Sequence, residues 1–520
     1  MTPLTRRTFV TGTLAAAGAA TLGATTAEAS PRKHPHPHPR PHGPRSRATL
    51  PSGIQSGDVT PTSAVVWARS SEEGRMIVTI TRGRSRRRYE VRGPLATAAT
   101  DFTAQVQLRQ LTQDTDYEYW IEFEDRRGRR GERGVGRFRT PAMGRRATSL
   151  VWTADTSGQG WGINPELGGM VAYQAMLATR PDLFIHSGDN IYGDNPILPE
   201  VVEPDGQIWR NVVDFGVDHV SETLADFRGR YRYNQSDANV REFYRNVPVI
   251  SQWDDHEVTN NWYPGEILTD ERYAEKRLDV LVPRARQAFF ENMPMATGPH
   301  PSGRIYRKVE RGGMLDVFVL DMRTDRGTNT PGLEPTPQPI LGREQVEWLI
   351  RGLARSKATW KVIAADMPIG LIVPDGPVNI EAVANRDPGL PLGRELEIAY
   401  VLSEIKRRRV RNVVWLTGDV HYCAVHHYDP ARAKFQDFDP FYEFVAGPIS
   451  AGGFGPNELD ATFGPELQFQ ALPRYVNQSP RDQKAMFFGH CDFDHRANLT
   501  VSLRNGLGEI LNTTRLTPTR

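Results

Sequence analysis

Short apolar runs divide the chain into two regions that differ in their spacing of polar residues. In the first region, residues 50–141, apolar and polar positions alternate over short segments with turn-forming residues between them. The clearest of these segments are 64–68, 76–80, 117–121 and 136–139. Alternation over so few residues predicts half-buried strands, and several such strands at close intervals are typical of a β-sandwich. We therefore expect an all-β domain here, and it contains no set of catalytic residues.

The second region, residues 147–520, has a different pattern. Strand-like apolar runs now alternate with longer segments of helical period, which predicts an α/β architecture. The predicted helices lie at 169–179, 224–233, 273–291 and 343–356. Two long segments rich in proline and glycine, 325–342 and 371–395, are predicted to be loops that line a substrate cleft. Residues 497–516 are expected to form a closing hairpin.

Several apolar runs in this second region end in an acidic residue. The strand-end acids are Asp155, Asp189, Asp254 with Asp255, Asp321, Asp366 and Asp419. One such acid usually caps a turn or a helix. Six acidic strand ends gathered at one rim would repel each other unless cations lay among them. The pattern therefore indicates a metal centre, with two ions, and the phenol of Tyr192 beside Asp189 favours a hard cation.

The overall composition limits the choice of partners. The net charge is only +2, with 38% hydrophobic and 24% charged residues, which argues against a stable nucleic-acid complex. The arginine clusters at 84–88 and 126–133 are interpreted first as solvated hairpin ends and second as patches that attract anions. The only two cysteines, Cys423 and Cys491, exclude a disulfide framework and a cysteine-rich zinc module.

The first residues indicate export from the cytoplasm. Arg6 and Arg7 precede a mild apolar run, and Ala27 and Ala29 form a small-residue cleavage site. Residues 1–29 are therefore predicted to be a twin-arginine signal that is removed, so the export machinery is an expected partner. We expect a secreted, periplasmic or cell-wall-associated protein without a transmembrane anchor. Residues 30–49, rich in proline and histidine, are expected to be a flexible linker.

The ordered motifs resemble those of a known family. Asp155, Gly-Asp-x-x-Tyr at 188–192, Asp-Asp-His-Glu at 254–257, Asp366 and Gly-Asp-Val-His at 418–421 resemble the calcineurin-like metallophosphoesterases, and most of all the PhoD family of alkaline phosphatases and phosphodiesterases. Residues 53–61 are similar to the start of that family's amino-terminal β-domain. The resemblance implies a four-layer αββα sandwich over 147–520, preceded by an immunoglobulin- or fibronectin-like domain over 50–141.

The same resemblance implies a binuclear site. The first metal would be bound by Asp155, Asp189, Tyr192 and His421. The second would share Asp189 and add Asp255, Asp419 and Asp366. In this family the metals are commonly Fe³⁺ and Ca²⁺, with Zn²⁺ or Mn²⁺ as alternatives. Members close to the founding enzyme have cysteine where this chain has Asp155, which is closer to the purple acid phosphatases and leaves the first metal open.

The implied reaction is hydrolysis of a small or polymeric phosphate ester by a hydroxide formed at the two cations, without a covalent phosphoenzyme. His256 is expected to protonate the leaving oxygen, or to orient a ligand carboxylate. Arg323 is expected to bind a phosphate oxygen, or to pair with the acids. Two alternatives remain: a purple-acid-phosphatase-like enzyme with another metal pair, and a non-catalytic, metal-stabilised binding protein.

Overall fold

The computed structural model describes residues 46–83, 87–296 and 303–519. The predicted export signal at 1–29 lies outside the described residues, as does the predicted linker up to residue 45. Within the described residues, no helix has both the length and the apolar character needed to cross a bilayer.

The amino-terminal region forms two antiparallel sheets that pack face to face. One sheet has the order β4-β3-β6-β7 and the other contains β1-β2-β5. The strands are β1 (Ile54–Gly57), β2 (Ser63–Arg69), β3 (Gly74–Arg82), β4 (Arg88–Ala96), β5 (Thr103–Arg109), β6 (Thr115–Glu124) and β7 (Gly134–Thr140). Alternate side chains such as Val66, Val78 and Tyr119 point inward and form one buried cluster. All four predicted strands of this region are confirmed.

The sandwich shares a sheet with the region that follows it. β1 runs parallel to β12 (Val249–Gln252), and Gly57 pairs with Val249. A Cβ atom at Gly57 would lie 2.2 Å from the carbonyl oxygen of Pro294, so only glycine permits this close approach. The result is a nine-stranded sheet in the order β24-β23-β22-β8-β9-β12-β1-β2-β5. Its other strands are β8 (Thr148–Thr153), β9 (Leu183–Ser187), β22 (Phe487–Phe493), β23 (Leu499–Asn505) and β24 (Ile510–Leu516).

A second sheet of seven strands faces the first. Its order is β13-β14-β15-β18-β20-β19-β21. The strands are β13 (Arg307–Arg311), β14 (Leu315–Val319), β15 (Trp360–Ala364), β18 (Val413–Thr417), β19 (Cys423–Tyr428), β20 (Phe441–Val445) and β21 (Pro465–Ala471). Trp152 and Ile185 from the first sheet pack against Val362 and Leu416 from the second, and all four are buried. The continuous apolar run of the central strand β18, Val-Val-Trp-Leu, reflects burial on both faces.

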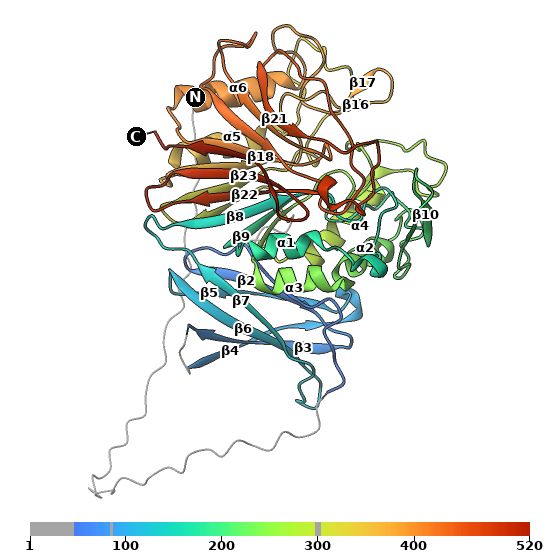
Figure 1. The fold of residues 1–520 in the computed structure, drawn as a ribbon. Helices are drawn as coiled ribbons and strands as arrows, with labels where there is room; N and C mark the ends of the chain where they lie inside the picture. Colours follow the sequence, from blue (N-terminus) through green and yellow to red (C-terminus); the bar gives the residue numbers. More distant parts are fainter. Residues whose placement is uncertain (1–45, 84–86, 297–302, 520) are drawn as a thin grey trace, which may run out of the picture. The chain divides into compact units, whose positions relative to one another are not determined.

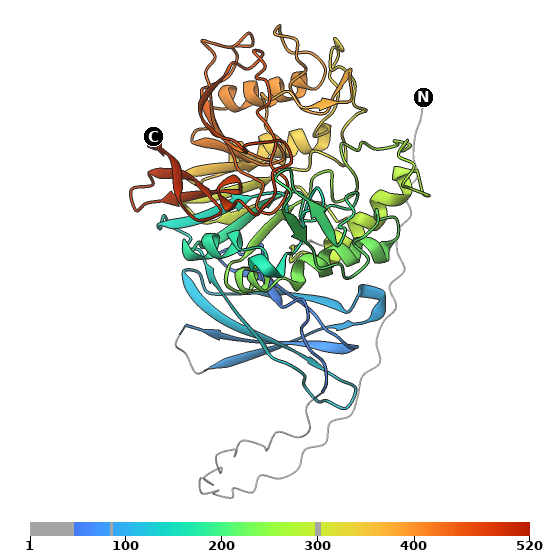
Figure 2. The same ribbon diagram turned by 45° about the vertical axis from the view of Figure 1, so that its right-hand side comes forward.

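Helices cover the outer faces of both sheets (Figures 1 and 2). α5 (Arg343–Arg355) and α6 (Glu395–Arg407) pack on the second sheet, while α1 (Ala172–Ala178) and α3 (Ala238–Asn246) pack on the first. α2 (Leu224–Ser236) and α4 (Leu278–Asn292) pack against each other beside Trp253. This arrangement is the expected αββα sandwich.

The sequence did not indicate every element. α3 and α6 were not predicted, and α4 begins at Leu278 rather than at residue 273. Segment 371–395, predicted as a loop, contains the short hairpin of β16 (Pro374–Asp375) and β17 (Asn379–Ile380). A further hairpin, formed by β10 (Glu200–Val202) and β11 (Ile208–Arg210), was also not predicted; it follows α1 and precedes α2 along the chain. Such short elements have too few residues to show a period.

Candidate metal centre

The acids that end the strands meet at one place. Asp155 follows β8, Asp189 follows β9 and Asp255 follows β12, three neighbouring parallel strands of the first sheet. Asp366 follows β15 and Asp419 follows β18, parallel neighbours in the second sheet. Because parallel strands end at the same edge, each sheet gathers its acids on one rim. The two rims are in contact, since ligand atoms of Asp255 and Asp419 lie within 4.8 Å of each other.

One group of potential ligands contains Asp155, Asp189 and His421, whose ligand atoms lie within 4.8 Å of one another. The hydroxyl of Tyr192 lies 3.3 Å from Oδ1 of Asp155 and 3.0 Å from Nε2 of His421. Nδ1 of His421 donates to the carbonyl of Gly452, which leaves Nε2 unprotonated and facing the acids. Oδ2 of Asp155 is buried and has no hydrogen-bond partner in the described part of the chain.

A second group lies beside the first and shares a residue with it. Asp189, Asp255 and His256 form one set of atoms within 4.8 Å, and Asp254, Asp255 and Asp419 form another. Asp189 therefore belongs to two of the groups of potential ligands. Asp254 was not predicted as a site residue, although its place in the Asp-Asp-His-Glu motif was a usable signal.

The turns that carry these acids are locked by Glu257, which is fully buried. Its carboxylate accepts hydrogen bonds from the backbone nitrogens of Asp189 at 3.1 Å, Asn190 at 2.6 Å and Asp254 at 2.7 Å. Asp189 itself has a left-handed backbone with φ of 52°, as has Asp155 with φ of 67°. Such conformations are costly for residues other than glycine, and they persist only where the surroundings enforce them.

Burial and mutual repulsion make ionisation of these acids costly. Burial, followed by the charge of Asp254, raises the pKa of Asp155 to about 8. Burial and neighbouring carboxylates likewise raise the pKa values of Asp189, Asp366 and Asp419 well above their usual range. Asp255 is the exception: burial opposes its ionisation, but the charges of His256 and Arg323 outweigh that effect and lower its pKa to about 2. The protein alone therefore supplies too little positive charge for the whole cluster.

His256 is held in a fixed orientation. Its Nδ1 lies 2.7 Å from Oδ1 of Asp194, a residue that the sequence analysis did not single out. Its ring lies against that of Tyr192, with the centroids 4.2 Å apart. Burial alone would lower the pKa of His256, but the charge of Asp194 outweighs burial and raises it to about 10. The imidazole therefore carries a proton at the wall of the cavity described below.

Arg323 lies beneath the acids rather than on the cavity wall. Its side chain is 0% exposed, and its Nε donates to Oδ1 of Asp254 at 2.6 Å. Its guanidinium also pairs with Glu381, another site residue that the sequence analysis missed. Nε of Arg323 lies 3.7 Å from Oδ2 of Asp366, whose two oxygens lack a hydrogen-bond partner among the described residues. Of the two expectations for Arg323, this geometry matches pairing with the acids.

A cavity of about 480 Å³ opens above the acids. Its described lining includes Asp189, Asp255, His256, Asp419 and His421, together with Glu381. Val373 and Pro374 come from segment 371–395, as predicted, while Phe454 and Asn457 come from a later loop and segment 325–342 contributes nothing to the described lining. The described lining contains the carboxamides of Gln159, Asn195, Asn260 and Asn261 but neither lysine nor arginine.

Two other buried histidines have partners outside the cluster of strand-end acids. His186 is buried, with its Nε2 3.0 Å from the hydroxyl of Thr156. His426 lies within β19 and pairs with Glu443 at 3.2 Å. Cys423 and Cys491 are both buried and unpaired.

Comparison with known proteins places this architecture in one family. Residues 150–503 match the model of the PhoD-like phosphatases, and residues 36–142 match that of the PhoD-like phosphatase amino-terminal domain. Alkaline phosphatase D of Bacillus subtilis (strain 168) is 31% identical over 329 residues, which cover 58% of this chain and 53% of that protein. The chain thus spans about half the length of this curated relative.

Solved structures share the fold. A structure of PhoD superimposes with a TM-score of 0.68 and 22% identity, covering 91% of this chain and 90% of the other. Purple acid phosphatase PPD1 from yellow lupin (Lupinus luteus) seeds superimposes with a TM-score of 0.55 and 12% identity, covering 91% and 74%. The strand-end acids, the two facing sheets and both family matches lead to one conclusion: the chain belongs to the PhoD-like phosphatase family.

Proposed function

We propose that this protein is an exported, metal-dependent phosphoesterase that hydrolyses phosphomonoesters, phosphodiesters or both. The observation that supports this most is the convergence of five potential ligands: Asp189, Asp255, Asp419 and His421 line one cavity, and Asp155 lies within 4.8 Å of Asp189 and His421. These residues come from four strand ends in two different sheets. Packing alone gives no reason to bury so many carboxylates together, whereas binding cations does.

The donor set fits two hard cations. Tyr192 with Asp155, Asp189 and His421 would hold the first, and Asp189, Asp255, Asp419 and Asp366 the second. Oxygens of Asp155 and Asp366 are buried without a hydrogen-bond partner in the described chain, as expected of ligand atoms. The phenol favours Fe³⁺ at the first position, and the all-oxygen second set favours Ca²⁺. Asp155 in place of the family cysteine supports the purple-acid-phosphatase-like alternative, in which another metal pair serves the same chemistry.

Bound cations would neutralise the phosphate and lower the pKa of a water molecule. The chain's own residues then have separate tasks. Asp194 keeps Nδ1 of His256 occupied, so that Nε2 is the nitrogen left to hand a proton to the leaving oxygen. Glu257 fixes the turns that carry Asp189 and Asp254. Arg323 balances the buried acids from below, and the carboxamides of the wall hydrogen-bond the rest of the substrate.

The remaining assignments follow from the sequence. Residues 1–29 would direct twin-arginine export and be removed, which gives a secreted, periplasmic or cell-wall-associated protein. Residues 30–49 would form a linker, 50–141 the β-domain and 147–520 the catalytic domain. Because the twin-arginine route carries folded proteins, the metals would be bound before export.

The proposal is tested on protein purified after export from a host that has the twin-arginine route. We expect iron and calcium in equal amounts by elemental analysis, and release of p-nitrophenol from p-nitrophenyl phosphate or bis(p-nitrophenyl) phosphate. Asp189→Asn should abolish metal retention and reduce hydrolysis by at least about 100-fold, since Asp189 is shared by both metals.

The matched control is Asp279→Asn, the same change at an exposed position in the first turn of α4, which should leave both readings unchanged. Zinc as the sole metal would show that the metal assignment is wrong while leaving the reaction intact. Bound metal without hydrolysis of either compound would favour the non-catalytic binding protein instead.

A further inference from the structure

A second cavity, of about 550 Å³, opens at the other end of the second sheet. Its lining includes the first residues of β15, β18 and β20 and the last turn of α6. The candidate metal ligands Asp366 and Asp419 follow the opposite ends of β15 and β18. A strand of five residues spans about 16 Å, so this cavity is distinct from the one above the metal centre.

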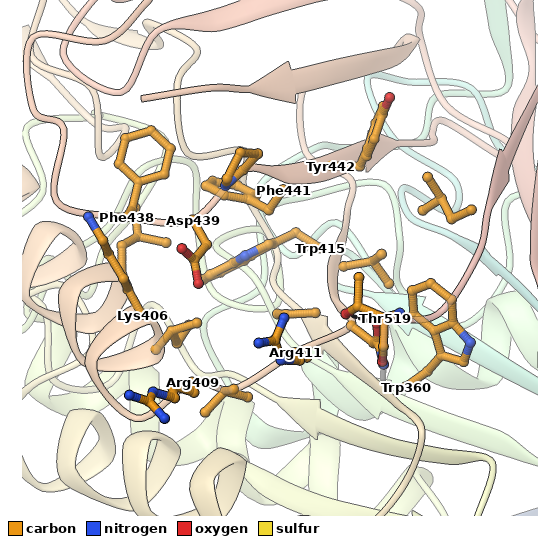
Figure 3. Close-up of a pocket in the computed structure, with 18 of the residues that line it drawn as sticks. Trp360, Lys406, Arg409, Arg411, Trp415, Phe438, Asp439, Phe441, Tyr442 and Thr519 are labelled. Atoms are coloured by element: carbon orange, nitrogen blue, oxygen red, sulfur yellow. Dashed lines mark hydrogen bonds between the residues drawn. The ribbon is translucent and has the colours of Figure 1, made fainter. Parts of the chain in front are cut away.

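The cavity combines cationic and aromatic side chains. Figure 3 shows Trp415 in the middle, Arg409 and Arg411 on one side and Phe441 on the other. Neither arginine makes an ion pair within the described ranges, whereas Arg92, Arg130, Arg133 and Arg139 of the amino-terminal β-sandwich do. The one acid of the lining, Asp439, leaves the arginines in excess. Two exposed guanidinium groups without a carboxylate partner attract an anion.

Trp415 adds an independent sign of a missing partner. Its side chain is 1% exposed, and its Nε1 is buried without a hydrogen-bond acceptor in the described part of the chain. By contrast, Nε1 of Trp360, in the same lining, donates to the carbonyl of Ala497 at 2.8 Å. Buried donors are nearly always paired, so an acceptor atom of a ligand would complete the environment of Trp415.

We propose that this cavity binds a small aromatic anion. Its acidic group would be bound by Arg409 and Arg411, and its ring would contact the small accessible edges of Trp415 and Phe441, which are 1% and 7% exposed. The volume lies within the range of small-molecule sites, aromatic edges form part of the lining, and guanidinium groups bind phosphate, sulfonate or carboxylate oxygens in pairs. The proposal is independent of the reaction at the metal centre.

Isothermal titration calorimetry of the metal-loaded full chain with naphthalene-1-sulfonate tests this proposal. The probe carries a ring and an anion but no phosphate ester, so it cannot be hydrolysed as a substrate. We expect one site with a Kd of about 1 mM or tighter. Methanesulfonate, which lacks the ring, and 1-naphthalenemethanol, which lacks the charge, should each bind at least about tenfold more weakly.

Two variants locate the site. Arg409→Gln combined with Arg411→Gln should weaken binding by at least about tenfold, and Trp415→Phe, which removes only the N–H and part of the ring, by a few-fold. Arg355→Gln, the same change at an exposed arginine of α5 outside the lining, should have no effect. Hydrolysis at the metal centre should be unchanged in all of them.

Absence of binding, or equal binding by the double arginine variant, would overturn the proposal. The arginines are exposed, so the double variant remains informative even if Trp415→Phe does not fold. If the double arginine variant bound the probe as tightly as the unchanged protein does, the probe would bind at the metal centre or elsewhere on the surface.

Discussion

The neighbours of His256 and Arg323 in the structure indicate different roles for these two residues, which were both selected from the sequence. His256 was selected from its place beside Asp255, but the sequence left open whether it donates a proton or orients a ligand. Its contact with Asp194 at 2.7 Å and its position on the cavity wall favour proton donation. Arg323 was selected in the same way, yet its 0% exposure means that it contacts acids rather than a substrate.

His256→Gln should lower kcat by about 10²–10⁴-fold for an alkyl phosphate, whose leaving oxygen needs a proton. The loss should be much smaller for p-nitrophenyl phosphate, whose leaving group departs as an anion. Asp194→Asn should show the same ordering with a loss of about 10–100-fold. Both KM values should change little, and steady-state kinetics with the two substrates measure all four quantities. Equal losses for both substrates together with reduced metal content would instead mean that His256 orients a ligand.

Arg323→Gln should lower the free energy of unfolding by about 3–5 kcal/mol, because it leaves the buried carboxylate of Asp254 without its cation and Glu381 with Arg326 alone. Urea unfolding of the metal-loaded protein measures this. Arg343→Gln serves as the control, since Arg343 pairs with Glu347 on the surface with 93% of its side chain exposed, and the cost should be below about 1 kcal/mol. A raised KM with unchanged stability would show that Arg323 contacts the substrate after all.

Strands and loops position these side chains. How well the sequence predicted an element differed between the short strands and the long loops. Strands such as β8 and β9 contain a short apolar run, 150–152 and 183–185, and an acid follows two residues after each strand, so both the strand and the candidate ligand could be predicted. Segment 371–395 could be recognised as a long loop, but nothing in it marked Glu381. That residue is fixed because Arg394 and Arg326 donate hydrogen bonds to backbone carbonyls of 380–382.

The junction between segment 371–395 and α6 should respond to pH. Burial, followed by the charge of Asp460, raises the pKa of Glu395 to about 8, against 4.5 for the free side chain. The folded state therefore binds a proton that the unfolded state releases, so the stabilisation is complete below pH 4.5 and is lost as the pH rises through about 8. Glu395→Gln should reduce this loss, measured as urea midpoints between about pH 5 and 9.

The control for Glu395 is Glu118→Gln, on the exposed face of β6, which should leave the pH dependence unchanged. An equally steep decline in Glu395→Gln would show that other groups cause it.

At the scale of the molecule, apolar side chains pack the two sheets against each other. At one rim, however, acids from both sheets meet and repel each other. Cations that bind this rim should therefore stabilise the entire fold. Removing them with a chelator should lower Tm by about 5 °C or more and abolish hydrolysis. Adding iron and calcium back should restore both. The difference in Tm should disappear in Asp189→Asn, and a chelator effect that persisted in that variant would show that the stabilising metal binds elsewhere.

The pattern of residues along the chain was enough to predict the β-sandwich, the αββα layers and the acids at the strand ends, because each depends on local spacing and on the family motifs. The register between the sheets, the roles of Asp254, Glu381 and Asp194, and the second cavity around Trp415 could not be predicted. They depend on which segments, far apart in the chain, become neighbours, and no local period records that. Asp194 and His256 are 62 positions apart, and only packing of the loops brings them within 2.7 Å.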